Sequence, residues 1–275
     1  MLKDIVVHLS GSEQDTATKY AVSVARTFEA HLTGIAFVYE PVIPATIMGG
    51  IPTEIIESQR ADSLKHAETA VTGFTTLVND SSVAFDTRTV DASLAGASEV
   101  FGQIARRFDL SIVGQADKDG TSPADLIIEG AMFQSGRPVI VVPFIQNEGL
   151  KLDRVVIGWD GSRQAARAIA DSIPFLQRAG RVEIVVVFGE RGKTYQTQGA
   201  VMTEHLLRHG INAELKRITA PKVDVQTTLL SYVSDSGADF LVMCAYGHSR
   251  LRELILGGVT RSMLASMTVP VLMAH

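Results

Sequence analysis

Cysteine is almost absent from this chain, which holds a single one, Cys244, in 275 residues. One cysteine cannot form an intrachain disulfide or build a zinc site from several thiolates, so both kinds of cross-link are excluded. Cys244 comes at the end of an apolar run that is typical of a buried strand. We therefore expect a packed, unreactive thiol at this position rather than a redox centre.

Positive charge and long apolar runs are scarce as well. The formal net charge is −5 and the pI is about 5.8, whereas binding along a nucleic-acid backbone needs a concentrated basic surface. No apolar run approaches the roughly 18–20 residues of a membrane-spanning helix, and the first residues lack the apolar core and cleavage site of a signal peptide. We therefore expect a soluble, cytoplasmic protein that binds neither nucleic acid nor a membrane.

Short signatures of catalysis and metal binding are also missing. No Gly-x-Ser-x-Gly turn follows the first strand of either half of the chain, and there is no His-Glu-x-x-His motif. His205 and His209 stand four residues apart, a spacing that zinc sites use, yet no carboxylate or thiol is marked out to join them. His8, within the first apolar run, is expected to be packed. We expect no catalytic residue and no metal site of these classes.

What the chain does have is a regular alternation of short apolar runs with segments of helical periodicity. The first such segment places Ala17, Tyr20, Val24 and Phe28 on one face. This alternation predicts a parallel α/β sheet with helices on both faces. Strands are expected at 4–9, 32–38, 83–89, 110–114 and 139–142, and helices at 17–28, 53–79, 94–108 and 124–134.

The same order begins again after a polar stretch near 147–149. Residues 5–12 align with residues 155–162, and residues 108–113 align with residues 238–243. The length suffices for two cores, so we predict two tandem, open, parallel-sheet domains of Rossmann-like fold, at 1–144 and 152–275, related by a pseudo-twofold axis. In the second half, strands are expected at 155–159, 182–188, 213–218, 240–243 and 269–273, and helices at 164–178, 195–209 and 223–236.

The most distinctive stretch follows the fourth strand of the second half. Gly247 opens a loop, and after nine intervening residues Gly257 and Gly258 lead into Val259, Thr260 and a helical segment. Glycines let backbone N–H groups approach an anion closely, and the positive end of a helix dipole favours its charge. The outline predicts a phosphate cradle, although it does not end in the Gly-Lys-Ser/Thr of a Walker loop. Further donors nearby are Ser249, Arg250, Ser262 and the imidazole of His248, which is otherwise a solvated loop residue.

Gly247, nine intervening residues and then Gly257-Gly258 resemble the nucleotide loop of universal stress proteins, whose usual pattern is Gly-x-x-Gly-x(9)-Gly followed by Ser, Thr or Gly. Cys244 stands where that pattern has its first glycine, and its side chain is expected to crowd the ribose and α-phosphate side of a nucleotide. The resemblance covers both halves. It implies an adenine-nucleotide α-hydrolase-like fold that binds ATP, or AMP or ADP, with or without Mg²⁺. It also implies that residues 139–142 and 271–273 form the seam between the halves.

The resemblance further implies a division of roles in the second half. Asp160 would contact the adenosine end, and the backbone around Phe188 would frame the adenine, while the glycine loop would hold the phosphates. The alternative for Asp160 is a turn that caps the next helix. Trp159 is expected to pack in the core. The candidate binding set is Gly158, Trp159, Asp160, Phe188, Met243, Cys244, Gly247, His248, Arg250, Gly257, Gly258, Val259 and Thr260.

The first half lacks this equipment. Ser10 stands where the second half has Asp160, and Asp117 stands where it has Gly247. An acidic residue in the cradle would repel phosphate, so we predict no nucleotide there and expect a structural or partner-facing copy. Gly114 does keep the glycine that the second half has lost.

Two functions of different classes follow. The first is a stress-response sensor that binds an adenine nucleotide in the second half and signals to an unidentified protein partner, with at most slow ATP hydrolysis or autophosphorylation. The second is a nucleotide-free interaction or small-ligand module whose site Cys244 closes. An adenylating enzyme is a remoter alternative, because no histidine pair or pyrophosphate signature follows the first strand. A homodimer is left open.

Overall fold

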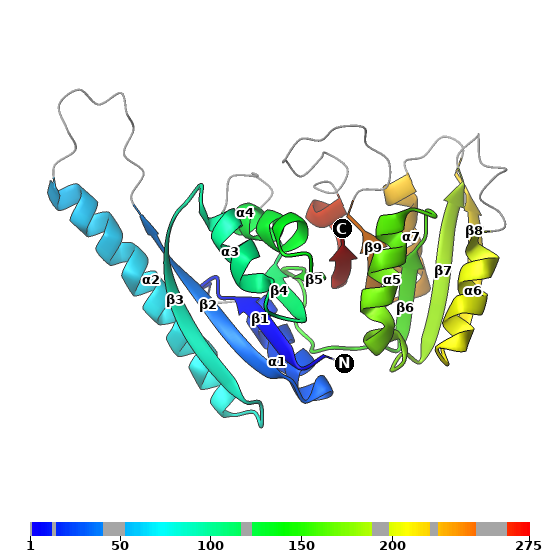
Figure 1. Ribbon diagram of the computed structural model, residues 1–275, viewed down its shortest axis with the longest axis horizontal. Helices are drawn as coiled ribbons and strands as arrows, with labels where there is room; N and C mark the ends of the chain where they lie inside the picture. Colours follow the sequence, from blue (N-terminus) through cyan, green and yellow to red (C-terminus); the bar gives the residue numbers. More distant parts are fainter. Residues whose placement is uncertain are drawn as a thin grey trace.

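The computed structural model of the protein describes residues 2–12, 15–40, 53–116, 123–188, 198–220, 225–245 and 263–275, to which all structural statements refer. Ten strands form one sheet in the order β3-β2-β1-β4-β5-β10-β9-β6-β7-β8 (Figure 1). The strands are β1 Asp4–His8, β2 His31–Glu40, β3 Phe85–Ser93, β4 Leu110–Gly114, β5 Val139–Val142, β6 Arg154–Gly158, β7 Arg181–Phe188, β8 Ala213–Thr219, β9 Phe240–Cys244 and β10 Val271–Ala274. The helices are α1 Thr16–Phe28, α2 Thr53–Asn79, α3 Ala97–Ala105, α4 Pro123–Glu129, the π-helix η1 Gly130–Gln134, α5 Arg163–Leu176, α6 Gln198–Arg208 and α7 Val225–Ser236.

The two halves of the sheet have the same strand order. Counted from its outer edge inwards, each half places its third, second, first, fourth and fifth strands in sequence, and all neighbours within a half are parallel. The fifth strands meet at the centre, where β5 and β10 pair antiparallel with Val141 opposite Val271. The predicted fold class and the predicted seam are therefore confirmed. The domain division at 1–144 and 152–275 stays a prediction.

A pair of carboxylates repeats the same contact in both halves. Asp109 Oδ2 accepts hydrogen bonds from the backbone N–H groups of Lys3 and Asp4, at 2.8 and 3.1 Å. Asp239 Oδ2 accepts from Asp153 and Arg154, at 3.0 and 3.2 Å. Each carboxylate thus holds the beginning of the first strand of its own half against the beginning of the fourth, which extends the duplication from strand order to side-chain contacts.

Two apolar layers cover the sheet. Side chains of α1, α2, α5 and α6 pack on one face, and those of α3, α4, η1 and α7 pack on the other. The first layer runs across the seam, because the rings of Phe28 on α1 and Phe175 on α5 lie 4.8 Å apart, edge to face. Burial on both faces explains why the central strands consist of uninterrupted apolar residues.

Two predicted elements differ from the structure. The helix expected at 124–134 is divided, because the chain passes from α4 into the π-helix η1 at Gly130. A side chain at Gly130 would collide with the backbone of Ser98 on α3, so the close contact between these helices requires glycine. The strand expected at 83–89 is β3, Phe85–Ser93, whose length is set by full pairing with β2. As an edge strand it is largely exposed, and its own apolar pattern is weak.

Within the described part of the chain, no helix combines the length and the apolar character needed to cross a bilayer.

Candidate functional site

The predicted site of the second half lies where β6 and β9 end side by side. These strands pair in parallel, with Ile157 opposite Val242, so their carboxyl ends open at the same edge of the sheet. The strand order reverses between them, since β7 lies on one side of β6 and β9 on the other. In open α/β sheets this reversal point is where ligands bind. The carboxyl ends of the two strands therefore meet at this edge, while most of the loop after β9 lies outside the described residues.

Asp160 is the first polar group at this point. Its Oδ1 atom accepts a hydrogen bond from the backbone N–H of Ser162, at 2.9 Å. The cap of α5 is the neighbouring hydroxyl, because Ser162 Oγ accepts from the N–H of Ala165 at 3.1 Å. Since Ser162 caps the helix, Asp160 Oδ2 is left for other partners. Among the described residues its partner is the Cys244 thiol, at 3.7 Å.

Cys244, the last residue of β9, fills the space beside that carboxylate. The residue is 8% exposed, and its Sγ lies 3.9 Å from Ser162 Oγ. Burial raises the pKa of the Cys244 thiol to about 11, and the negative charge of Asp160 adds to the shift. The thiol is therefore protonated at neutral pH and donates weakly to Asp160. This is the packed, unreactive thiol that the sequence predicts.

Two other predicted residues have structural reasons for their identity. A Cβ atom at Gly158 would come within 2.8 Å of Leu229 Cδ2 on α7, so glycine lets that helix approach β6. Trp159 packs partly buried against the core, as expected, and its backbone N–H donates to Val185 O at 2.9 Å. Its indole Nε1 is buried with no hydrogen-bond partner among the described residues.

Phe188 and Met243 flank the crevice. Phe188 ends β7, the neighbour of β6, and is 9% exposed. Met243 precedes Cys244 and is partly exposed against the core layer of α7. The remaining predicted residues lie outside the described residues: Gly247, His248, Arg250, Gly257, Gly258, Val259 and Thr260.

The described polar groups at this edge are one carboxylate and one buried thiol. A carboxylate with a weakly engaged oxygen can accept hydrogen bonds from hydroxyl groups or an amine. It would repel phosphate. The Cys244 side chain lies directly beside the carboxylate, where a glycine would leave open space.

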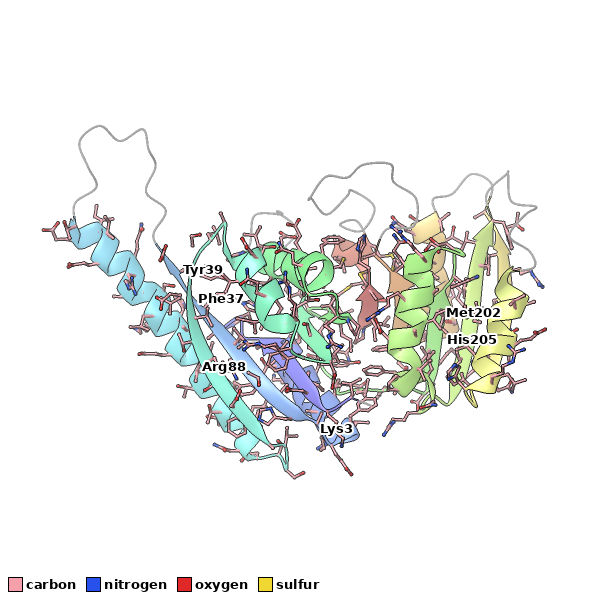
Figure 2. The ribbon with its side chains drawn as sticks, viewed as in Figure 1. Lys3, Phe37, Tyr39, Arg88, Met202 and His205 are labelled. Atoms are coloured by element: carbon pink, nitrogen blue, oxygen red, sulfur yellow. The ribbon has the colours of Figure 1, made fainter. Side chains whose placement is uncertain are left out.

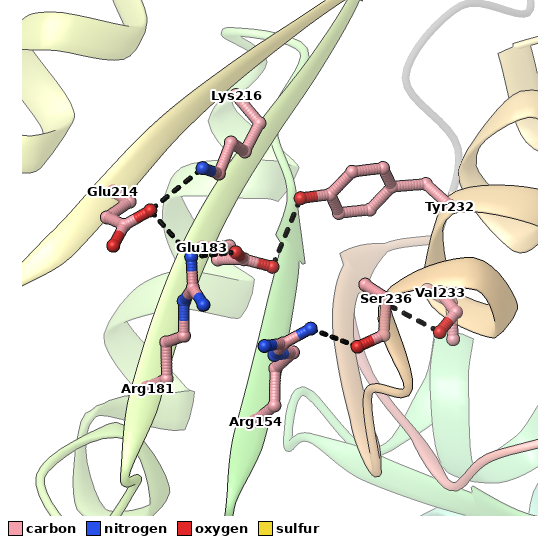
Figure 3. A network of polar contacts seen from close by, with 8 residues as sticks. All are labelled: Arg154, Arg181, Glu183, Glu214, Lys216, Tyr232, Val233 and Ser236. Atoms are coloured by element: carbon pink, nitrogen blue, oxygen red, sulfur yellow. Dashed lines mark hydrogen bonds and ion pairs between the residues drawn. The ribbon is translucent and has the colours of Figure 1, made fainter.

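The other ionic cluster of the second half belongs to the framework. Figure 3 shows Glu183, 2% exposed near the amino end of β7, accepting a hydrogen bond from the Tyr232 hydroxyl at 3.1 Å and pairing with Arg181 at 3.0 Å. Arg181 also pairs with Glu214, which Lys216 contacts at 2.8 Å. The buried charge is fully partnered, and it lies at the opposite end of the strands from Asp160. Among the described residues no group of three or more His, Cys, Asp or Glu side chains could hold a metal ion.

Comparison with known proteins shows what the C-terminal half of the chain resembles. Residues 151–275 match the model of the universal stress protein family. This half of the chain is therefore similar to universal stress proteins. The universal stress protein Slr1230 of Synechocystis sp. (strain ATCC 27184 / PCC 6803 / Kazusa) is 26% identical over 146 residues, which are 50% of this chain and 46% of that relative. The chain thus spans about half the length of the curated relative it matches.

The similarity of fold extends over both halves of the chain. The crystal structure of a universal stress protein from Archaeoglobus fulgidus DSM 4304 matches 98% of this chain and 96% of its own, with a TM-score of 0.69 and 16% identity. That identity shows the fold alone. A universal stress protein solved in complex with cAMP matches 45% of this chain and 97% of its own, at 18% identity and a TM-score of 0.37, which carries no argument about a ligand here.

Proposed function

We propose that the protein is a universal stress protein that binds an adenine nucleotide, ATP, ADP or AMP, in its C-terminal half and passes the bound state to a protein partner in a stress response. Asp160 would hold the ribose or the base, and the backbone around Phe188 would border the adenine. The glycine pattern from Gly247 to Gly258 would hold the phosphates, with Mg²⁺ where the nucleotide carries one. Ordering of that loop around phosphate would be the change that a partner detects.

The observation that carries the proposal is the position of the Asp160 carboxylate. It stands at the carboxyl end of β6, beside the end of β9, where the strand order reverses. The helix cap that would explain an aspartate at this turn is supplied by Ser162 instead. Asp160 holds its turn with Oδ1, which accepts from the Ser162 N–H, while Oδ2 contacts only the weak Cys244 donor among the described residues. The second oxygen, at the edge where α/β sheets bind ligands, supports a role toward a ligand.

Isothermal titration of the full chain with ATP and with AMP, each with and without Mg²⁺, tests the proposal. We expect saturable binding that Asp160→Asn weakens by about tenfold or more, because one strong acceptor is lost. Asp171→Asn is the matched control, since it removes an equal charge from the surface of α5, where Asp171 pairs with Arg167. Equal affinity in wild type and Asp160→Asn would sink the assignment of Asp160.

A second candidate function is a module that acts without nucleotide. It is favoured by the contact between the Cys244 thiol and Asp160, because the side chain occupies the space that the first glycine of the pattern leaves open. Cys244→Gly separates the two. If the wild type does not bind and Cys244→Gly does, the thiol closes an inherited site. If neither binds at millimolar nucleotide, the protein acts through its surface or another ligand.

A further inference from the structure

A cavity lies in the N-terminal half, at the carboxyl ends of β1, β2 and β4. Its volume is about 570 Å³, which falls within the roughly 300–1,000 Å³ of pockets that hold small molecules. Gly114 and Gln115, at the end of β4, line it together with Leu9 and Ser10, at the end of β1. The strand order of this half reverses between β1 and β4. The cavity therefore occupies the edge of the sheet at which a ligand is expected.

Aromatic and small apolar side chains form much of the wall. Phe37 and Tyr39 lie near the carboxyl end of β2 (Figure 2), with ring centroids 5.8 Å apart and an angle of only 18° between the ring planes. The His8 ring lies 5.9 Å from that of Phe37. On the side of α2, the buried Ala67 and Ala70 leave room that larger residues would fill. Such a wall suits a flat ring.

Two polar groups at the wall have no partner within the described residues. The His8 side chain lines the cavity, is 7% exposed and makes no hydrogen bond there. The Tyr39 hydroxyl is buried and also has none. Buried polar groups in native proteins are nearly always hydrogen-bonded. The imidazole of His8 lines the cavity without a partner among the described residues, which points to a ligand that supplies one.

Two of the other polar side chains at the wall are engaged. Both carboxylate oxygens of Asp15 cap α1, accepting from Thr18 N at 2.9 Å and from Thr18 Oγ1 at 2.7 Å. The Gln115 amide donates to Leu264 O at 2.5 Å, and its oxygen accepts from Phe144 N at 3.0 Å. No lysine or arginine is among the described lining residues. Burial lowers the pKa of His8 to about 4, so its imidazole is neutral.

We propose that this cavity binds an uncharged small molecule with a flat ring and a hydrogen-bonding group at its edge, such as a phenol or a nitrogen heterocycle. Its ring packs on Phe37 and its polar edge pairs with the imidazole of His8, which offers one donor and one acceptor. A phosphate finds no lysine or arginine among the described residues of this wall. The proposal does not depend on a nucleotide in the C-terminal half, where Gly158 occupies the position of His8.

Fluorine NMR titration of the full chain with 4-fluorophenol and 5-fluoroindole tests it. We expect saturable binding that His8→Phe weakens by about tenfold, because the ring wall is kept and the hydrogen bond is lost. Gly114→Cys should weaken it as strongly by filling the cavity, since a Cβ there meets only Ala17 Cβ, at 3.8 Å. His205→Gln on the exposed face of α6 is the control and should bind like the wild type.

Three results would overturn the proposal. They are no binding of either probe at millimolar concentration, binding that neither His8→Phe nor Gly114→Cys weakens, and displacement of a bound probe by AMP. The last would make the cavity a nucleotide site. Thermal unfolding shows whether each variant is folded. If His8→Phe does not fold, the binding measured for Gly114→Cys tests the proposal by itself.

Discussion

The two halves of this sheet share strand order, the antiparallel seam and the aspartate that holds the first strand, yet their ligand edges differ. The first half has His8, Ser10 and Gly114 around a cavity. At the aligned positions the second half has Gly158, Asp160 and Cys244, where a thiol contacts a carboxylate. Three positions thus change an edge that surrounds a cavity into one where a thiol contacts a carboxylate.

The two halves keep the same residues where both need them for folding, and they differ elsewhere. The clamps of Asp109 and Asp239 are alike because each half must hold its first strand to its fourth. Side chains beyond the ends of the strands carry little of the core, so they are free to diverge. Each half can therefore take a ligand of different chemistry.

The largest expected difference between the halves is the loss of stability at low pH caused by His8. Burial lowers the pKa of His8 in the folded protein to about 4, below the ordinary histidine value of about 6.5, so the unfolded chain takes up this proton first as the pH falls. Stability from His8 is complete above pH 6.5 and is lost as the pH falls toward 4. We expect this residue alone to lower the free energy of unfolding by about 2 kcal/mol between pH 7 and pH 4.5. Urea unfolding at both pH values measures it.

The control compares the loss of unfolding free energy between pH 7 and pH 4.5 in the wild type and in two variants. Carboxylates titrate alike in wild type and His8→Phe, so the smaller acid loss of His8→Phe isolates this residue. His205→Phe, which changes an exposed histidine of the second half, should keep the wild-type loss. An equal loss in all three proteins would show that the buried imidazole does not distinguish the halves.

Substitution of the glycines at the ends of β6 and β4 is expected to change the free energy of unfolding by a smaller amount. Gly158→Ala places a Cβ 2.8 Å from Leu229 Cδ2, whereas Gly114→Ala meets only Ala17 Cβ at 3.8 Å. We expect Gly158→Ala to destabilise by about 1 kcal/mol, since the end of a leucine side chain can shift. Gly114→Ala should be neutral or stabilise by up to about 0.5 kcal/mol, because alanine restricts the unfolded chain. Chemical denaturation of both proteins decides, and the reverse order would contradict the geometry.

The smallest effect concerns the reactivity of the single thiol. Moving it with Gly114→Cys/Cys244→Ala takes it away from the Asp160 charge, which raises the pKa of Cys244 in addition to burial. Loss of that charge lowers the pKa of the thiol and so raises the thiolate fraction. Alkylation by iodoacetamide at pH 8, followed by mass spectrometry, should be severalfold faster. Asp160→Asn should also accelerate alkylation of Cys244, and unchanged rates in both proteins would contradict the electrostatic account.

Much of the framework could be predicted because its signals are local or repeated. Apolar runs between helical segments indicate the strands, and the alignment of 5–12 with 155–162 indicates the duplication. The division of the helix at Gly130 could not be predicted, because it depends on a contact with Ser98, far away in the sequence. The length of β3 was also missed, since pairing with β2 sets it and its own apolar pattern does not.

The site divides in the same way. The meeting of Asp160 and Cys244 could be predicted, because the ends of neighbouring parallel strands share one edge. The partners of each group could not, since Ser162 takes the capping role and leaves Asp160 to the thiol. The glycine loop lies outside the described residues and stays a prediction.

The sequence by itself determined the alternation of strands and helices, the duplication and the single protonatable thiol, because these depend on residue type and spacing along the chain. Only the tertiary structure decided that His8, expected to be packed, lines a cavity. Residues of β1, β2, α2 and β4 line this cavity. Because these segments lie far apart in the sequence, the volume between them follows from how they pack and cannot be predicted from any one segment.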